Sequence, residues 1–173
     1  MNAEIQIRDE RPPDAASIRR VIREAFGADL EARLVDLIRD RNKHLISLVA
    51  VNGDDIFGHI LFSAVTIADA PSNLRAIGLA PVAVLPQCQR RGIGSALIRE
   101  GLDRCRHAHY GLVVVLGDPA YYSRFGFRPA NMFGLENEYG VNDEFMVLEL
   151  ERGTLTSLRG MVRYAPEFNE VGC

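Results

Sequence analysis

The spacing of apolar residues in the amino-terminal part of the chain predicts a short strand followed by two amphipathic helices. Ile5 and Ile7 alternate with polar residues, as in an edge strand. After Pro12-Pro13, apolar residues recur three and four positions apart, which is the spacing of one helix face: Ile18, Val21, Ile22, Ala25 and Phe26. A second stripe of the same kind follows Asp29: Leu30, Leu34, Leu37 and Ile38. Gly27 separates the two helices, because glycine favours helix ends.

Longer apolar runs predict the strands of a sheet. The segments 45–51 and 56–67 flank Asn52-Gly53-Asp54-Asp55, a pattern typical of an antiparallel hairpin. A further strand begins near Leu74 and stops at Pro86, since proline ends a strand of this kind. These runs predict three neighbouring strands in the middle of the chain.

A helix and a buried strand follow. Apolar residues at helical spacing predict a helix from Gly92 to about Arg106. Leu112–Leu116 is a continuous apolar run, as expected for a strand that is covered on both faces. A strand, a helix and a strand in this order require a parallel, right-handed crossover.

The carboxyl-terminal third has weaker patterns. A short helix and turn are predicted over 121–127, and a loop near the substrate over 131–144. The segments 145–150 and 161–164 are predicted to form a hairpin around Arg152-Gly153. No repeat or linker interrupts the chain, so the sequence predicts one domain over residues 1–173, of α/β class with a mixed sheet (α+β).

Composition narrows the classes of function. The chain has 173 residues, 47% of them hydrophobic and 25% charged, and a net charge of −3. Nothing in this composition indicates a broad surface for nucleic acid or membrane, and the basic character is local, at Arg90 and Arg91. The charged amino terminus does not resemble a signal peptide, and no apolar run is long enough to span a bilayer. The cysteines lack the spacing of metal ligands: Cys88, Cys105 and Cys173. We therefore expect a cytoplasmic protein with reduced thiols and no bound metal.

One stretch carries most of the chemical information. Gln89–Ser95 (Gln-Arg-Arg-Gly-Ile-Gly-Ser) is a basic, glycine-containing loop that leads from a strand into the start of a helix. The first N–H groups of a helix have no intrahelical partner and lie at the positive end of its dipole, so this segment is suited to phosphate. No lysine follows Gly94, which argues against a Walker loop. Leu97 and the long connection before Gly92 argue against a dinucleotide site, in which Asp118 would bind the ribose.

Two motifs resemble one family. The pattern Val-x-Pro-x-x-Gln-x-Arg-Gly-x-Gly-Ser-Ala-Leu, from Val84 to Leu97, is similar to the loop that binds the coenzyme A pyrophosphate in the GNAT superfamily of N-acetyltransferases. Tyr122 stands four residues before Gly126-Phe127 and resembles the Tyr-x-x-x-Gly-Phe element of the same family. The sequence around both motifs is most similar to that of a bacterial branch of predicted acetyltransferases. The resemblance is most specific over residues 76–130.

The resemblance implies a fold, a reaction and a set of site residues. In the GNAT acyl-CoA N-acyltransferase fold, two parallel strands of a mixed sheet, here Val82–Leu85 and Leu112–Leu116, splay apart and are flanked by helices. The backbone of Val82, Ala83 and Val84 would hold the pantetheine of acetyl-CoA, and the amide of Val84 would polarise the thioester. The loop residues that would hold the pyrophosphate are Gln89, Arg90, Arg91, Gly92, Ile93, Gly94 and Ser95. Tyr122 would protonate the departing thiolate.

The implied activity is acetyl transfer from acetyl-CoA to a primary amine by direct attack in a ternary complex, without a metal. A non-catalytic acyl-CoA-binding regulatory domain is the alternative. The acceptor stays open between a small amine, an antibiotic, a peptide amino terminus and a protein lysine, and the protein is expected to be a monomer or homodimer. The general base also stays open among several residues: Glu24, Glu31, His59, Asp118, Glu136 and Glu138.

Overall fold

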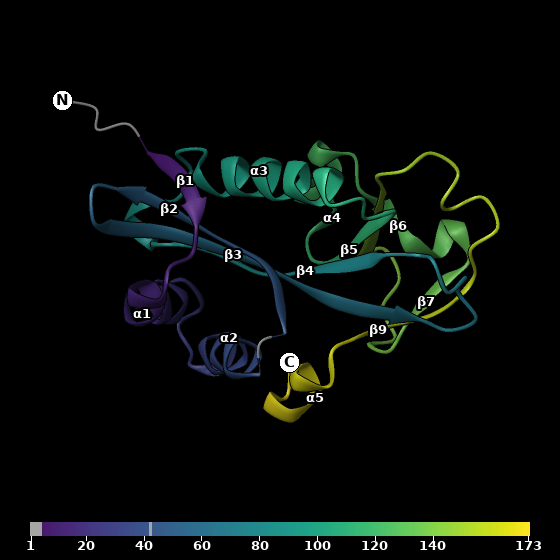
Figure 1. Ribbon diagram of the computed structural model, residues 1–173, viewed down its shortest axis with the longest axis horizontal. Helices are drawn as coiled ribbons and strands as arrows, with labels where there is room; N and C mark the ends of the chain where they lie inside the picture. Colours follow the sequence, from purple (N-terminus) through teal and green to yellow (C-terminus); the bar gives the residue numbers. More distant parts are fainter. Residues whose placement is uncertain (1–4, 42) are drawn as a thin grey trace. The chain divides into compact units, whose positions relative to one another are not determined.

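The structure is a computed structural model that describes residues 5–41 and 43–173, with only the backbone described at positions 44 and 45. The described residues form two compact units. The first comprises the described residues up to Phe62 together with Pro81–Gly101 and Pro166–Cys173, and the second comprises Ser63–Ala80 and Leu102–Ala165. Strands β3 and β4 and helix α3 each run from one unit into the other (Figure 1).

The first unit holds the two predicted amino-terminal helices. In chain order its complete elements are β1 (Gln6–Asp9), a 3₁₀ turn (Pro12–Asp14), α1 (Ala15–Phe26), α2 (Leu30–Asp40), β2 (His44–Asn52), a second 3₁₀ turn (Pro86–Cys88) and α5 (Pro166–Val171). Strand β1 pairs antiparallel with β2, with Gln6 opposite Val51, and β3 (Asp55–Ile67) lies next to β2. Helix α1 buries its apolar face, although Phe26 at its end is 44% exposed, contrary to the predicted stripe.

The second unit contains the parallel strands. Its complete elements are β5 (Leu112–Leu116), α4 (Pro119–Tyr122), 3₁₀ turns over Ser123–Phe125 and Ala130–Phe133, β6 (Arg128–Pro129), β7 (Leu135–Asn137), β8 (Phe145–Glu149) and β9 (Gly160–Tyr164). Strand β4 (Ala76–Val84) pairs parallel with β5, and α3 (Ile93–His107) is the crossover helix that connects them. The predicted order of strand, helix and parallel strand is therefore confirmed, and β5 is fully buried from Leu112 to Val115.

The carboxyl-terminal prediction was wrong in two respects. Strands β8 and β9 do not form a hairpin, because β8 pairs with β5 and β6 whereas β9 pairs with β3 and β7. The connection from Leu150 to Arg159 is longer than a hairpin turn, and the open edges of β5 and β3 accept one strand each. The segment 131–144, predicted as a loop, contains most of a 3₁₀ turn and all of β7.

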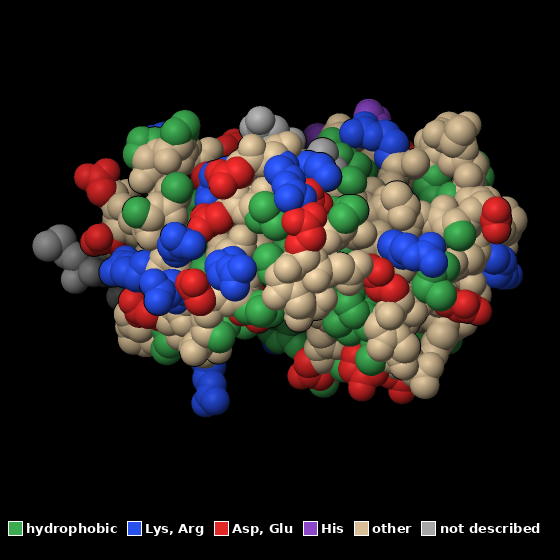
Figure 2. Space-filling view, turned by 90° about the horizontal axis from the view of Figure 1, so that it is seen from below, with side chains coloured by type: hydrophobic (Ala, Val, Ile, Leu, Met, Phe, Trp, Pro, Cys, Tyr) green, Lys and Arg blue, Asp and Glu red, His purple; other side chains and the backbone are tan. Residues whose placement is uncertain are grey.

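The surface is not dominated by one sign of charge on the face that Figure 2 shows. Lys and Arg side chains lie among Asp and Glu side chains there. This mixture fits the small net charge of −3. Among the described residues, no helix is long and apolar enough to cross a membrane.

Candidate active site

The loop that follows β4 adopts two left-handed backbone conformations. After the 3₁₀ turn at Pro86–Cys88, Arg90 has φ +60° and Gly92 has φ +83°. Glycine accepts this conformation without steric cost, whereas arginine is strained in it, and such strain is concentrated at functional sites. An added Cβ at Gly92 would meet no atom within 4 Å, so the backbone there is open to a ligand.

Local hydrogen bonds fix this loop against the end of β4. The Gln89 side-chain amide donates to the Val84 carbonyl at 3.0 Å, and the Cys88 N–H donates to the Leu85 carbonyl at 2.8 Å. The Leu85 N–H in turn donates to the carbonyl of Phe57 on β3 at 2.9 Å. The loop therefore has a fixed position relative to the sheet of the first unit.

Helix α3 begins directly after the loop and is packed tightly on β3. An added Cβ at Gly58 of β3 would lie 2.9 Å from Leu97 Cδ1 and 3.2 Å from Ile93 Cγ2. The absence of a side chain at Gly58 thus lets the first two turns of α3 approach the strand. Ile93 and Leu97 are both buried, which fixes the amino-terminal end of the helix.

The amino-terminal end of α3 presents N–H donors that have no acceptor within the helix. The Ala96 N–H donates to the Gly92 carbonyl at 2.9 Å, which is the first helical hydrogen bond. The N–H groups of Ile93, Gly94 and Ser95 precede that bond and have no intrahelical acceptor. Arg90 and Arg91 are exposed beside them. Unpaired N–H groups, a helix dipole and two guanidinium groups together favour an anion.

Pairing between the parallel strands covers only the first part of β4. The register runs from Ala76 opposite Leu112 to Leu79 opposite Val115. Strand β4 then continues to Val84, so the predicted pantetheine-binding residues 82–84 lie beyond the last pair with β5. Leu116, the final residue of β5, is 43% exposed although it is apolar.

Tyr122, the predicted proton donor, lies in the second unit on α4. The Asp118 carboxylate caps this short helix by accepting the Ala120 N–H at 2.9 Å. The Tyr122 ring lies against Gly117, where a Cβ would collide with it, and its centroid is 5.8 Å from that of Phe127. The side chain is buried, and this burial raises the pKa of Tyr122, so its hydroxyl stays protonated at neutral pH.

Comparison with known proteins identifies the family. Residues 6–130 match the family described as an acetyltransferase (GNAT) domain. The chain is 36% identical over 165 residues to the "Uncharacterized N-acetyltransferase YhbS" of Escherichia coli strain K12, a match that covers 94% of this chain and 98% of that protein. The chain belongs to the GNAT acetyltransferase family. The expected enzyme class, an acetyltransferase, is therefore confirmed.

Solved structures agree with this assignment. The crystal structure of YhbS from Escherichia coli in complex with CoA is similar with a TM-score of 0.92 and 34% identity, covering 98% of this chain and 94% of that one. A GNAT family acetyltransferase from Brucella melitensis, in complex with acetyl-CoA, is similar with a TM-score of 0.80 and 38% identity, covering 96% and 99%. The predicted fold class, a GNAT fold with a mixed sheet, is confirmed.

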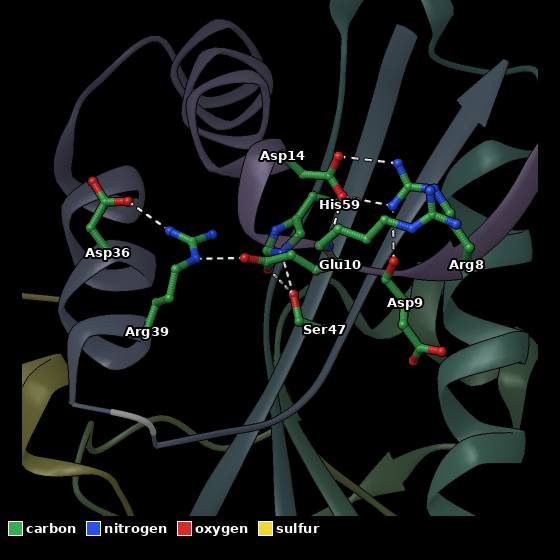
Figure 3. Close-up of polar contacts among 9 residues, drawn as sticks. Arg8, Asp9, Glu10, Asp14, Asp36, Arg39, Ser47 and His59 are labelled. Atoms are coloured by element: carbon green, nitrogen blue, oxygen red, sulfur yellow. Dashed lines mark hydrogen bonds and ion pairs between the residues drawn. The ribbon is translucent and has the colours of Figure 1, made fainter. Parts of the chain in front are cut away.

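His59, a candidate base of this GNAT acetyltransferase, lies inside a buried polar network in the first unit (Figure 3). Its Nε2 atom is 2.9 Å from Ser47 Oγ, and the Ser47 hydroxyl donates to the Glu10 carboxylate. Arg39 Nε donates to the other Glu10 oxygen at 2.5 Å, and Arg39 Nη1 donates to Asp36 at 2.9 Å. His59 has no exposed surface, so it does not reach a substrate directly in this arrangement.

The network has a definite protonation state. Burial lowers the pKa of His59, which keeps the imidazole neutral. Burial alone would raise the pKa of Glu10, but the adjacent His59, whose Nε2 lies 3.6 Å from a Glu10 oxygen, and the hydrogen bonds from Arg39 and Ser47 outweigh it and hold this pKa far below its usual value. Because the Ser47 hydroxyl proton points to Glu10, its oxygen accepts the His59 Nε2–H, and His59 Nδ1 is the unprotonated nitrogen.

The sequence pointed to His59 alone in this network. Glu10, Arg39 and Ser47 were not recognised, because each is a common residue without a local motif and their separations along the chain reach 37 residues. The other candidate bases are dispersed. Asp118 is a helix cap, Glu138 accepts the Tyr164 N–H at 3.0 Å, and Glu24 and Glu136 are exposed.

A cavity of about 550 Å³ opens elsewhere in the second unit. It lies among the loops before β4, before β5 and before β9, and its charged lining includes Asp69, Arg75 and Glu151. None of the described residues that the family motifs implicate lies on its wall, so we do not assign the acetyltransferase chemistry to it. Within the described ranges, no group of three or more His, Cys, Asp or Glu side chains is placed to hold a metal ion.

Proposed function

We propose that this protein transfers an acetyl group from acetyl-CoA to a primary amine, by direct attack of the amine on the thioester within a ternary complex. The observation that carries the proposal is the start of α3, where the N–H groups of residues 93–95, which have no acceptor within the helix, follow two exposed arginines in the chain. A diphosphate has the charge and acceptor atoms that such a group of donors requires. The relatives with bound CoA and acetyl-CoA support the same ligand class.

The residues of the loop take different parts in this proposal. The backbone N–H groups of Gly92–Ser95 bind phosphate oxygens, and Arg90 and Arg91 neutralise their charge. The side-chain amide of Gln89 already donates to the Val84 carbonyl, so we assign the Gln89 side chain to holding the loop and only its backbone to the ligand. The backbone of Val82, Ala83 and Val84 follows the last β4–β5 pair and would bind the pantetheine arm, with the Val84 amide facing the thioester carbonyl.

Tyr122 supplies the proton in this reaction. The CoA thiolate that leaves must be protonated, and a thiol has a pKa of about 8.5 against about 10 for an ordinary tyrosine. Burial raises the pKa of Tyr122 further, so the hydroxyl is protonated when acetyl-CoA binds. Transfer of this proton to the less basic thiolate leaves a tyrosinate, which takes up the proton that the attacking amine releases as the amide forms. Alignment of the amine with the thioester contributes the rest of the acceleration through positioning.

The Tyr122→Phe variant tests this proposal against a binding domain without activity. We expect free-thiol release from acetyl-CoA, measured with a panel of amines and peptides, to fall about a hundredfold in kcat, the lower end for general acid catalysis. The dissociation constant for acetyl-CoA, measured by calorimetry, should stay within about twofold, because the Phe ring retains the packing.

The matched control is Tyr121→Phe, the neighbouring ring that is covered by Arg124 at 4.4 Å and has no assigned role in proton transfer. We expect wild-type rates from it. Equal rates for Tyr122→Phe and wild type would disprove the role of Tyr122. Saturable acetyl-CoA binding without thiol release for any amine would instead indicate the non-catalytic domain, and no binding at all would refute both.

A further inference from the structure

A buried tyrosine from a distant strand lies where the pairing of β4 with β5 ends. The Tyr164 hydroxyl of β9 is 3.3 Å from the carbonyl oxygen of Leu79 on β4 and 3.3 Å from that of Val114 on β5. Leu79 belongs to the last β4–β5 pair, opposite Val115. Tyr164 is 5% exposed, so these contacts are made away from water. One side chain therefore touches both strands at the point beyond which their pairing stops.

The fold fixes this side chain from both ends. Strand β9 pairs with β3 so that Tyr164 stands opposite Val65, and the Tyr164 N–H donates to the Glu138 carboxylate at 3.0 Å. The ring then passes over β4 at Gly78, where a Cβ would collide with the ring atom Cε1. Gly78 is thus required for the hydroxyl to reach β5.

The hydroxyl acts as a donor and not as a titrating group. Burial raises the pKa of Tyr164 well above its ordinary value, so the proton stays on the oxygen throughout the working pH range. One proton serves two carbonyls, and both distances of 3.3 Å are long for an O–H donor, as expected for a shared bond. A tyrosine in this state holds backbone groups and does not transfer protons.

We propose that Tyr164 is a positioning residue for acetyl-CoA, a role that rests on the function proposed above. A further backbone pair would hold the strands about 4.8 Å apart and continue the ladder. A side-chain hydroxyl instead offers a hydrogen bond to one carbonyl of each strand without drawing the following residues together. The backbone of β4 after Leu79 then stays available to the pantetheine and thioester.

The binding of two ligands can be compared to distinguish a positioning role of Tyr164 from a general packing role. Acetyl-CoA contains the pantetheine and thioester, whereas adenosine 3′,5′-bisphosphate contains only the nucleotide end. For Tyr164→Phe we expect the dissociation constant of acetyl-CoA to rise about tenfold, which corresponds to one lost hydrogen bond, and that of the bisphosphate to change less than twofold. Calorimetry on the full chain at fixed salt measures both constants.

Tyr110→Phe is the matched control. Tyr110 is equally buried, at 6% exposed, but it precedes the other end of β5, where the Arg75 guanidinium lies 4.4 Å from its ring centroid. We expect it to leave both dissociation constants unchanged. Gly78→Ala is a second test, because it displaces the Tyr164 ring without removing the hydroxyl. It should also weaken the binding of acetyl-CoA and leave the binding of the bisphosphate unchanged.

The outcomes distinguish the two proposals. If Tyr164→Phe binds acetyl-CoA as tightly as wild type, or weakens both ligands equally, Tyr164 is only a packing residue and the positioning role is refuted. If Tyr164→Phe fails to fold, the dissociation constants of Gly78→Ala for acetyl-CoA and for the bisphosphate decide between the two roles. Failure of the wild-type protein to bind acetyl-CoA would instead refute the proposed function, and with it the role that rests on it.

Discussion

Two polar regions of the first unit differ in how their hydrogen-bonding groups are used. In the loop Gln89–Ser95, the arginines are exposed and the N–H groups at the start of α3 have no partner within the helix. In the network of Glu10, Arg39, Ser47 and His59, the side chains are enclosed and bind mainly one another. The loop is therefore arranged to receive a ligand, whereas the network joins the residue that follows β1 to α2, β2 and β3.

The comparison shows that a perturbed pKa does not by itself indicate catalysis. The network contains two groups of strongly altered pKa, Glu10 and His59, and its histidine is fully buried. Structural ion pairs alter pKa values as effectively as active sites do. Two atoms of the network, His59 Nδ1 and Arg39 Nη2, are buried without a hydrogen-bond partner among the described residues.

The largest expected effect is the loss of stability when the network around Glu10 is broken. Glu10→Ala removes the carboxylate that Arg39, Ser47 and His59 share, and it leaves the largely buried Arg39 guanidinium with only Asp36. We expect the free energy of unfolding, measured by urea denaturation, to fall by about 2–3 kcal/mol, somewhat below the loss for a fully buried pair because both groups retain some exposure. Asp40→Ala, at the exposed end of α2, should change it by less than about 0.5 kcal/mol. Equal losses for the two variants would contradict the role of the network.

Substitutions in the loop should have the opposite effect: they should weaken the binding of acetyl-CoA and leave the stability of the fold unchanged. In the double variant Arg90→Ala/Arg91→Ala, we expect the dissociation constant for acetyl-CoA to rise about tenfold at low salt, because two charge-assisted contacts to phosphate are lost. The difference from wild type should shrink as salt is raised, since the arginines are exposed. The melting temperature should hardly change.

A control with the same loss of charge separates local contacts from net charge. Arg20 and Arg33 are exposed on α1 and α2, and Arg20→Ala/Arg33→Ala removes the same two positive charges. We expect wild-type affinity for acetyl-CoA. The loop assignment fails if this control weakens binding as much as the loop variant does.

The smallest expected effect is on the pH dependence of stability. The pKa of His59 in the folded protein lies below the ordinary histidine value of 6.5, because the imidazole is buried, so the unfolded chain binds a proton first as the pH falls. Stability from neutral His59 is present above pH 6.5 and is lost below it, by up to about 1.4 kcal/mol per pH unit until the folded imidazole also titrates. The lowered pKa of Glu10 adds a loss of the same sign at more acidic pH.

The measurement is urea denaturation of wild type and His59→Gln at several values between pH 7 and pH 5. We expect a flatter dependence in the variant, because it lacks the group that titrates in the unfolded chain. His109→Gln is the matched control, since the His109 side chain is 83% exposed. An unchanged slope in His59→Gln would show that other groups cause the pH dependence.

The sequence by itself determined the features that depend on neighbouring residues. Helical periodicity placed α1, α2 and α3, and the contiguous motif from Val84 to Leu97 indicated both the phosphate loop and the family. Tyr122 followed from a motif of a few residues, and its role remains a prediction. These features were readable because backbone conformation and helix-end donors are set by residues close together in the chain.

Only the tertiary structure decided which distant groups meet. The partners of β8 and β9, the network around Glu10, and the contact of Tyr164 with Leu79 were not readable, the last joining residues 85 positions apart. Short apolar strands fit several partners equally well, and a buried polar group has no periodicity to indicate its partner. The choice depends on which strand edges remain open and on where a glycine such as Gly78 leaves room, and both are properties of the folded chain.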